Sequence, residues 1–136
     1  MGQSSQSLAV LYVEDDPDSV LLFRRAIQRH ESVDLLLADS GAAALALARE
    51  RPTHLAFVDL HLPDTSGVEL VGKLRSTPGT AHAMIFLLSA ATSDELQAEL
   101  AGSGADGYLS KPLELARLSG IIEGARARRD SGSGPA

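Results

Sequence analysis

A chain of 136 residues is long enough for one compact domain and too short for two. Its composition, 44% apolar and 22% charged, allows a buried core and differs from that of disordered chains. The formal net charge of −6 argues against sequence-independent binding of nucleic acid, and the lack of cysteine excludes disulfides, thiolate zinc sites and cysteine nucleophiles.

The two ends of the chain differ from its middle. Residues 1–7 are polar and lack the basic and apolar regions of a signal peptide, and residues 130–136 have the composition of a flexible tail. No apolar run approaches the ~18–20 residues of a membrane span. We therefore expect flexible ends and one cytoplasmic domain over residues 8–129, without membrane contact.

Short apolar runs alternate with longer amphipathic segments. The runs predict strands at residues 8–13, 33–38, 55–58, 84–88 and 107–109, because unbroken apolarity over a few residues is typical of strands covered on both faces. The alternation predicts an α/β fold with a five-stranded parallel sheet and helices on both faces. Since the chain is too short for a barrel of eight strand–helix units, we expect an open, flavodoxin-like sheet.

The segments between the strands predict five helices. Asp16 and Ser40 are candidate N-caps of the first two, and Pro17 occupies a favoured first helical position. Ser93 begins the fourth helix, and the last helix ends near Arg129. The apolar faces of the third and last helices are predicted to contain Gly67, Leu70, Val71 and Leu74, and Leu118, Ile121, Ile122 and Ala125, respectively.

Polar residues follow four of the predicted strands. Glu14 and Asp15 follow the first strand, Asp59 the third, Ser89 the fourth and Lys111 the fifth. Because the carboxyl ends of parallel strands share one edge of an open sheet, these side chains should converge. Carboxylates that lie close together repel one another, and a bound proton or cation relieves this repulsion. The candidate ligands are oxygen atoms, with no His or Cys at the spacing of metal ligands, which suits Mg²⁺ or Mn²⁺ rather than zinc.

Such a site can carry out phosphoryl transfer. Asp59 could accept a phosphoryl group, since the metal and Lys111 would neutralise charge on the incoming group. The hydroxyl of Ser89 would donate a hydrogen bond to a phosphoryl oxygen. The product, an aspartyl phosphate, is a covalent and reversible mark.

From Leu8 to Arg128 the chain resembles the response-regulator receiver domain, the CheY-like family of two-component signalling. The likeness includes the loop over residues 59–67, and the intervals from the acidic cluster to Asp59, on to Ser89 and on to Lys111 match the family's usual spacing. The resemblance implies that a phosphohistidine on a sensor histidine kinase donates the phosphoryl group, and that the domain catalyses only its own phosphorylation and dephosphorylation.

The resemblance also implies a set of metal ligands. Asp15 would bind Mg²⁺ directly, and Glu14 would act through a metal-bound water. Asp59 would be both a metal ligand and the phosphorylated residue. The backbone carbonyl of His61 would complete the coordination, and the side chain of His61 borders the site. The other histidines, His30, His54 and His82, are expected at the periphery.

A switch is implied by the same likeness. Ser89 would move toward the phosphoryl group, and Tyr108 would then turn inward, although an aromatic residue at this position is more often simply packed in the core. Lys111 would contact the phosphoryl group, and the bond from Lys111 to Pro112 is typically cis in this family.

The expected partners are proteins. No effector domain follows Arg129, which favours a stand-alone receiver that signals through a downstream protein target. The output surface would be the last two helices and the fifth strand, where a second copy of the chain could also bind as a homodimer. The stretch over residues 14–22 is similar to stand-alone receivers paired with phytochrome-type kinases.

Two other functions remain open. The first is a Mg²⁺-dependent phosphohydrolase with an aspartyl-phosphate intermediate, although haloacid-dehalogenase-type enzymes usually place an Asp two residues after the nucleophile, where this chain has His61. The second is a degenerate receiver that only binds partners, which the presence of Asp15, Asp59, Ser89 and Lys111 disfavours.

Overall fold

Five parallel strands form a single sheet in the computed structural model, which describes residues 7–90 and 94–132. The strands are β1 (Leu8–Val13), β2 (Val33–Ala38), β3 (Leu55–Asp59), β4 (Met84–Ser89) and β5 (Gly107–Ser110). Their order in the sheet is β2-β1-β3-β4-β5, which is the flavodoxin-like order. The predicted sheet is confirmed, and β3, β4 and β5 each extend one residue beyond the predicted end.

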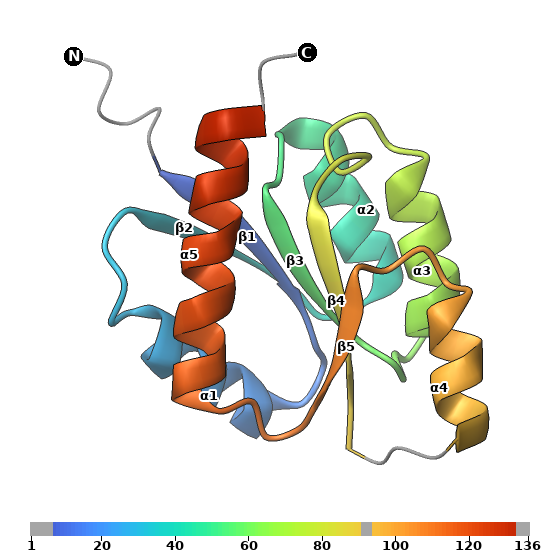
Figure 1. Ribbon diagram of the computed structural model, residues 1–136. Coiled ribbons are helices and arrows are strands. Elements are labelled where there is room, and N and C mark those ends of the chain that lie inside the picture. Colours follow the sequence, from blue (N-terminus) through green and yellow to red (C-terminus); the bar gives the residue numbers. More distant parts are fainter. Residues whose placement is uncertain (1–6, 91–93, 133–136) are drawn as a thin grey trace.

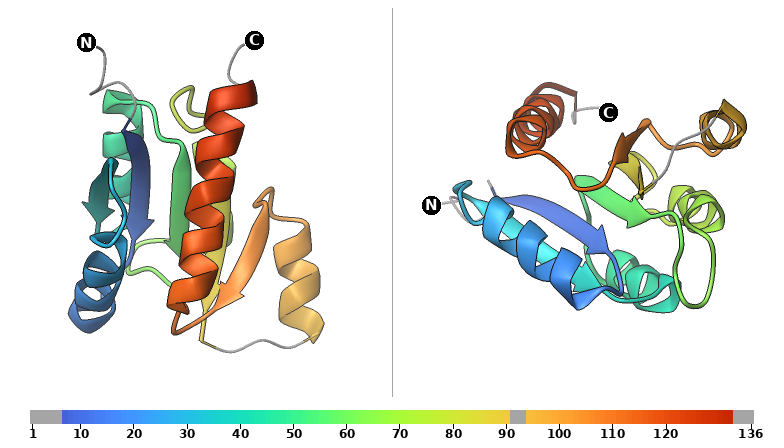
Figure 2. Two further views of the ribbon diagram at one scale, coloured as in Figure 1. Left: turned by 60° about the vertical axis from the view of Figure 1, so that its left-hand side comes forward. Right: turned by 90° about the horizontal axis from the view of Figure 1, so that it is seen from below.

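Helices cover both faces of this sheet. They are α1 (Pro17–Ile27), α2 (Gly41–Glu50), α3 (Gly67–Arg75), α4 (Asp94–Ala101) and α5 (Leu115–Gly132). Helices α1 and α5 lie on one face, and α2, α3 and α4 lie on the other (Figures 1 and 2). All strands point the same way, so their carboxyl ends share the lower edge in Figure 1, far from the start of β1 and the last turn of α5.

The predicted N-caps are confirmed. Asp16 Oδ2 accepts a hydrogen bond from the backbone N–H of Ser19 at 3.1 Å, and Ser40 Oγ accepts one from Ala43 at 3.1 Å. Each cap pairs a backbone donor that the first helical turn leaves without an intrahelical partner. Ser93, the predicted start of α4, lies outside the described residues.

Two apolar cores stabilise the sheet, one on each face. The core under α1 and α5 contains a run of aromatic rings in which Tyr12 stacks on Phe23 with centroids 3.9 Å apart and Phe23 meets Phe57 edge-on. The core under α2, α3 and α4 is mainly aliphatic. Strands β1 and β3 are fully buried, whereas the edge strand β2 is mostly half-buried because it has one neighbouring strand only.

One expectation was wrong. Residues 130–132 form the last turn of α5 rather than part of a flexible tail. Composition misled here, because Ser and Gly weaken a helix by only about 1 kcal/mol per residue and the preceding residues are good helix formers. His54 precedes β3, at the opposite end of this strand from Asp59, as expected of a histidine peripheral to the site. It is half-buried, and its Nδ1 accepts a hydrogen bond from the backbone N–H of Ala9 at 2.9 Å.

None of the helices in the described ranges combines the length and the apolar character that a membrane span requires.

Candidate functional site

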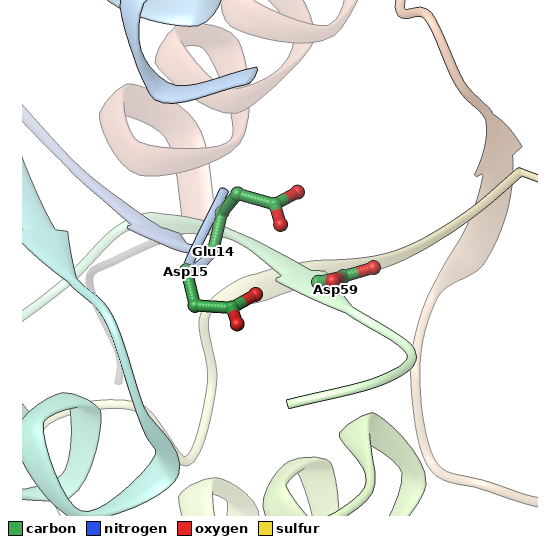
Figure 3. A group of neighbouring side chains, drawn as sticks. All are labelled: Glu14, Asp15 and Asp59. Carbon is green, nitrogen blue, oxygen red and sulfur yellow. The ribbon is translucent and has the colours of Figure 1, made fainter. Parts of the chain in front are cut away.

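Three carboxylates meet at the carboxyl edge of the sheet. Glu14 and Asp15 directly follow β1 and Asp59 ends β3, and the two strands are neighbours in register, with Val13 opposite Val58. Each of the three side chains has a carboxylate oxygen within 4.8 Å of one from each of the others (Figure 3). Glu14 and Asp59 are buried and Asp15 is exposed, so the cluster opens to solvent on the Asp15 side.

An ammonium group lies against two of these carboxylates. Lys111 follows β5, and its Nζ lies 2.6 Å from Glu14 Oε1 and donates a hydrogen bond to Asp59 Oδ1 at 3.3 Å. The side chain of Glu14 is only 1% exposed, yet Oε1 has no well-aligned hydrogen-bond donor among the described residues. Its contact with Lys111 is therefore a contact between charges, and a buried oxygen remains that a further donor could satisfy.

The electrostatics of the site follow from burial and from the neighbouring charges. Burial raises the pKa of Glu14, and Lys111 opposes this rise without cancelling it. Burial alone would lower the pKa of Lys111, but the adjacent carboxylates of Glu14 and Asp59 raise it above its ordinary value. Burial, followed by the charges of Glu14 and Asp59, also raises the pKa of Tyr12. The site thus carries an excess of negative charge that a cation would relieve.

The residues present fit a divalent cation with oxygen ligands. Glu14, Asp15 and Asp59 supply carboxylate oxygens only, which is the donor set that Mg²⁺ prefers. A metal-bound water would also supply the donor that the buried Glu14 Oε1 lacks. The predicted convergence of these residues and Lys111 is confirmed.

Ser89 lies on the same edge. It ends β4, the strand between β3 and β5, and is 5% exposed. Its backbone carbonyl accepts a hydrogen bond from the N–H of Lys111 at 2.9 Å, which connects the ends of β4 and β5. The bond from Lys111 to Pro112 is cis, as the resemblance implied.

Tyr108 lies apart from the carboxylates. It belongs to β5 and is paired with Leu87 of the neighbouring strand β4. Its side chain is half-buried and packs against the core that α2, α3 and α4 cover. The structure therefore places Tyr108 on the side of the sheet that faces α4, in the packed position that aromatic residues commonly take.

His61 lies in the loop between β3 and α3 and is exposed. The base of this loop is closed by a bridge between His61 and Ser66 and by a hydrogen bond from Gly67 N–H to the carbonyl of Leu60 at 2.7 Å. Residue 67 must be glycine, because an added Cβ would lie 2.5 Å from the backbone oxygen of Asp59. The loop therefore begins directly after Asp59, and its far end at Gly67 is held against the backbone of Asp59 and Leu60.

One surface feature near the site was not predicted. A groove of about 710 Å³ opens beside Lys111, between α1 and the start of α5, and Tyr12, Phe23 and Leu118 are among its lining residues. Leu22 and Leu115, which also line it, are 62% and 47% exposed. The sequence held a weak signal for this groove, since Leu22 lies outside the helix face formed by Val20, Phe23, Ala26 and Ile27, which packs against the core.

The fold and the site together define a doubly wound α/β domain with an acidic cluster and a lysine at the carboxyl edge of its sheet. Residues 10–123 match the family described as the response regulator receiver domain. The chain belongs to this family, whose members act in two-component systems.

Individual relatives agree with this assignment. The chain is 34% identical over 117 residues to the transcriptional regulatory protein KdpE of Mycobacterium tuberculosis, covering 83% of this chain and 50% of KdpE. It is 29% identical over 115 residues to the polar-differentiation response regulator DivK of Brucella ovis, covering 85% of this chain and 93% of DivK. The chain therefore spans half the length of KdpE but most of DivK.

A solved structure shows the same fold. The chain matches a co-crystal structure of the Saccharomyces cerevisiae histidine phosphotransfer signaling protein Ypd1 with the receiver domain of its downstream response regulator Ssk1. The TM-score is 0.80 at 28% identity, with 90% of this chain and 91% of that chain covered. Receiver domains bind Mg²⁺ at an acidic pocket and interact with histidine kinases or phosphotransfer proteins and with downstream targets.

Proposed function

We propose that this chain is a phosphorylation-dependent switch in which Asp59 accepts a phosphoryl group. Asp15, Asp59 and the backbone carbonyl of His61 would hold Mg²⁺, and Glu14 would act through a metal-bound water. The observation that carries the proposal is the contact of Asp59 with Lys111 at 3.3 Å inside a cluster of three carboxylates. Mn²⁺ prefers the same oxygen ligands and would support the same chemistry.

The chain supplies a nucleophile and a positive charge. A carboxylate oxygen of Asp59 forms a bond to phosphorus as the phosphorus–nitrogen bond of a donor phosphohistidine breaks, and the leaving imidazole takes a proton from water. Lys111, already hydrogen-bonded to Asp59, neutralises charge on the transferred group. Mg²⁺, when bound, supplies further charge neutralisation at the phosphoryl oxygens. The chain would catalyse only its own phosphorylation and dephosphorylation.

Phosphorylation changes the charge of a buried site and so biases an equilibrium between two conformations. Ser89 lies at the end of β4, the strand next to β3, and its hydroxyl donates a hydrogen bond to the new phosphoryl group. Tyr108 lies in the next strand and reports this change to the surface formed by α4, β5 and α5. A downstream protein, or a second copy of this chain, binds there.

The groove beside Lys111 supports a protein as phosphoryl donor. Contiguous exposed apolar side chains are typical of protein contacts, and Leu22 and Leu115 are both exposed along this groove. A donor helix lying in the groove would bring its phosphohistidine next to Lys111 and Asp59. The donor is a sensor histidine kinase, of the phytochrome type by the likeness of residues 14–22, and the chain acts as a stand-alone receiver.

The test is intact-mass measurement after incubation with acetyl phosphate and Mg²⁺. Wild type should gain the mass of one phosphoryl group, and Asp59→Ala should gain none. Asp18→Ala, which removes an exposed carboxylate from the first turn of α1, should react like wild type. Phosphorylation of Asp59→Ala would contradict the proposal, and sustained turnover of a phosphate ester beyond one equivalent per chain would indicate a phosphohydrolase instead.

A further inference from the structure

The loop that carries His61 is fastened to the start of α2. Asp64, near the tip of the β3–α3 loop, accepts a hydrogen bond from the backbone N–H of Gly41 on Oδ1 at 2.8 Å and one from Ala42 on Oδ2 at 3.0 Å. These are the first two residues of α2. Both carboxylate oxygens of an exposed side chain are thus used to join two elements that are not adjacent in the sequence.

The contact surface is shaped to let the loop approach α2. A Cβ added at Gly41 would lie 2.6 Å from Thr65 Cγ2 and 3.3 Å from Asp64 Oδ1, so a larger residue at position 41 would push against the loop tip. The two N–H donors also lower the pKa of Asp64, which keeps the carboxylate charged and able to accept both bonds.

Asp64 is therefore the outer anchor of a loop whose inner end is Asp59. The base is held by the bridge between His61 and Ser66 and by the bond from Gly67 to Leu60. Within the loop, Leu62 N–H bonds to the carbonyl of Thr65 at 3.2 Å, so displacement at the tip is passed to the backbone next to His61.

We infer that Asp64 is a positioning residue for the metal site: by fastening the β3–α3 loop to the start of α2, it sets the position of the His61 backbone carbonyl. This inference rests on the proposed function, since it concerns the binding of Mg²⁺ beside Asp59. It assigns to Asp64 a role in metal affinity in addition to its role in capping α2.

The test compares Mg²⁺ dissociation constants from isothermal titration calorimetry. We expect Asp64→Ala to weaken Mg²⁺ binding about tenfold, at the lower end of the effect of residues that orient metal ligands. Asp64→Asn keeps one acceptor oxygen but not the second, and it should fall between wild type and Asp64→Ala. Loss of amide-exchange protection at Gly41 and Ala42 would show that the anchor has been removed from a folded chain.

Two matched controls separate positioning from helix capping and from charge. Ser40→Ala removes the other cap of α2, the bond from Ala43 N–H to Ser40 Oγ, without touching the loop. Asp39→Asn removes an exposed negative charge next to α2. Both controls should bind Mg²⁺ within about twofold of wild type, because neither disturbs a group that orients a ligand.

The outcomes distinguish this inference from the proposed function. If wild type binds Mg²⁺ and Asp64→Ala binds it equally well, or if Ser40→Ala weakens binding as much as Asp64→Ala, the positioning role is overturned while the proposed function stands. If wild type itself binds no Mg²⁺, both are overturned.

Discussion

The ammonium of Lys111 lies 2.6 Å from Oε1 of Glu14, although the two residues follow β5 and β1, which are separated in the sheet by β3 and β4. The long side chain of Lys111 reaches across the ends of these strands to a carboxylate that is almost fully buried. Because Lys111 also contacts Asp59, it occupies the position of a counter-ion in the acidic cluster. The response of the site to Mg²⁺ and to replacement of Lys111 should therefore depend on this balance of charge.

Mg²⁺ should stabilise the folded chain, because a ligand that binds only the folded state shifts the unfolding equilibrium. At about one hundred times its dissociation constant the cation adds about 2.7 kcal/mol, which corresponds to a rise in Tm of about 10 °C for a domain of this size. Differential scanning calorimetry with and without Mg²⁺ measures the rise. In Asp15→Asn, which removes a carboxylate from the cluster, the rise should shrink strongly, and equal rises in both proteins would count against the site.

Replacing Lys111 should separate phosphorylation from signalling. Lys111→Met leaves the fold intact and removes a cation that competes with Mg²⁺, so the Mg²⁺ dissociation constant should fall about tenfold, since like charges a few ångströms apart near a protein surface repel by 1 kcal/mol or more. NMR signals of the Tyr108 ring should no longer shift on phosphorylation. The matched control is Lys73→Met, which changes the exposed lysine of α3. An undiminished Tyr108 shift in Lys111→Met would defeat this expectation.

The groove predicts a difference between two neighbouring leucines of α1. Leu22 lines the groove beside Lys111, whereas Leu21, 44% exposed, is not among its lining residues. Leu22→Asp should lower kcat/KM for phosphotransfer from a histidine kinase by about tenfold, the effect of losing about 1.4 kcal/mol of interface energy. Phosphorylation by acetyl phosphate should stay unchanged, since this small donor needs no docking surface. If Leu21→Asp impairs the kinase reaction as much as Leu22→Asp, the groove is not the docking site.

His54 should make stability depend on pH. Burial, followed by the charge of Arg129, lowers the pKa of His54, and the neutral ring accepts the hydrogen bond from Ala9. Below about pH 6.5, the usual pKa of histidine, the unfolded chain binds a proton at this position that the folded chain does not. The free energy of unfolding should therefore fall as the pH is lowered through this value, until the lower pKa of the folded chain is reached.

Urea unfolding between about pH 7.5 and 5 measures this dependence. His54→Gln keeps an acceptor for Ala9 N–H but does not titrate, so part of the wild-type slope should disappear. His82→Gln, at an exposed histidine, should keep the wild-type slope. The same slope in wild type and His54→Gln would rule out this contribution.

Much of the fold could be predicted from local sequence. Buried strands such as β1 and β3 are recognisable because both of their faces are covered, which requires unbroken apolar runs. Asp16 and Ser40 were recognisable as caps because a cap bonds to residues only three positions away. The acidic cluster followed from the rule that parallel strands bring their carboxyl ends to one edge.

Contacts between distant elements could not be predicted in this way. The bonds of Asp64 to α2, of His54 to Ala9, and of Arg75 to Asp106 across the start of β5 each join segments whose mutual approach depends on the whole packed fold. The sequence by itself determined the element order, the strands and the types of side chain at the carboxyl edge, because periodicity and strand ends are local properties. Only the tertiary structure decided that Lys111 reaches Glu14 and Asp59 and that the metal-site loop is fastened to α2, because hydrogen bonds and ion pairs form over a few ångströms that packing alone sets.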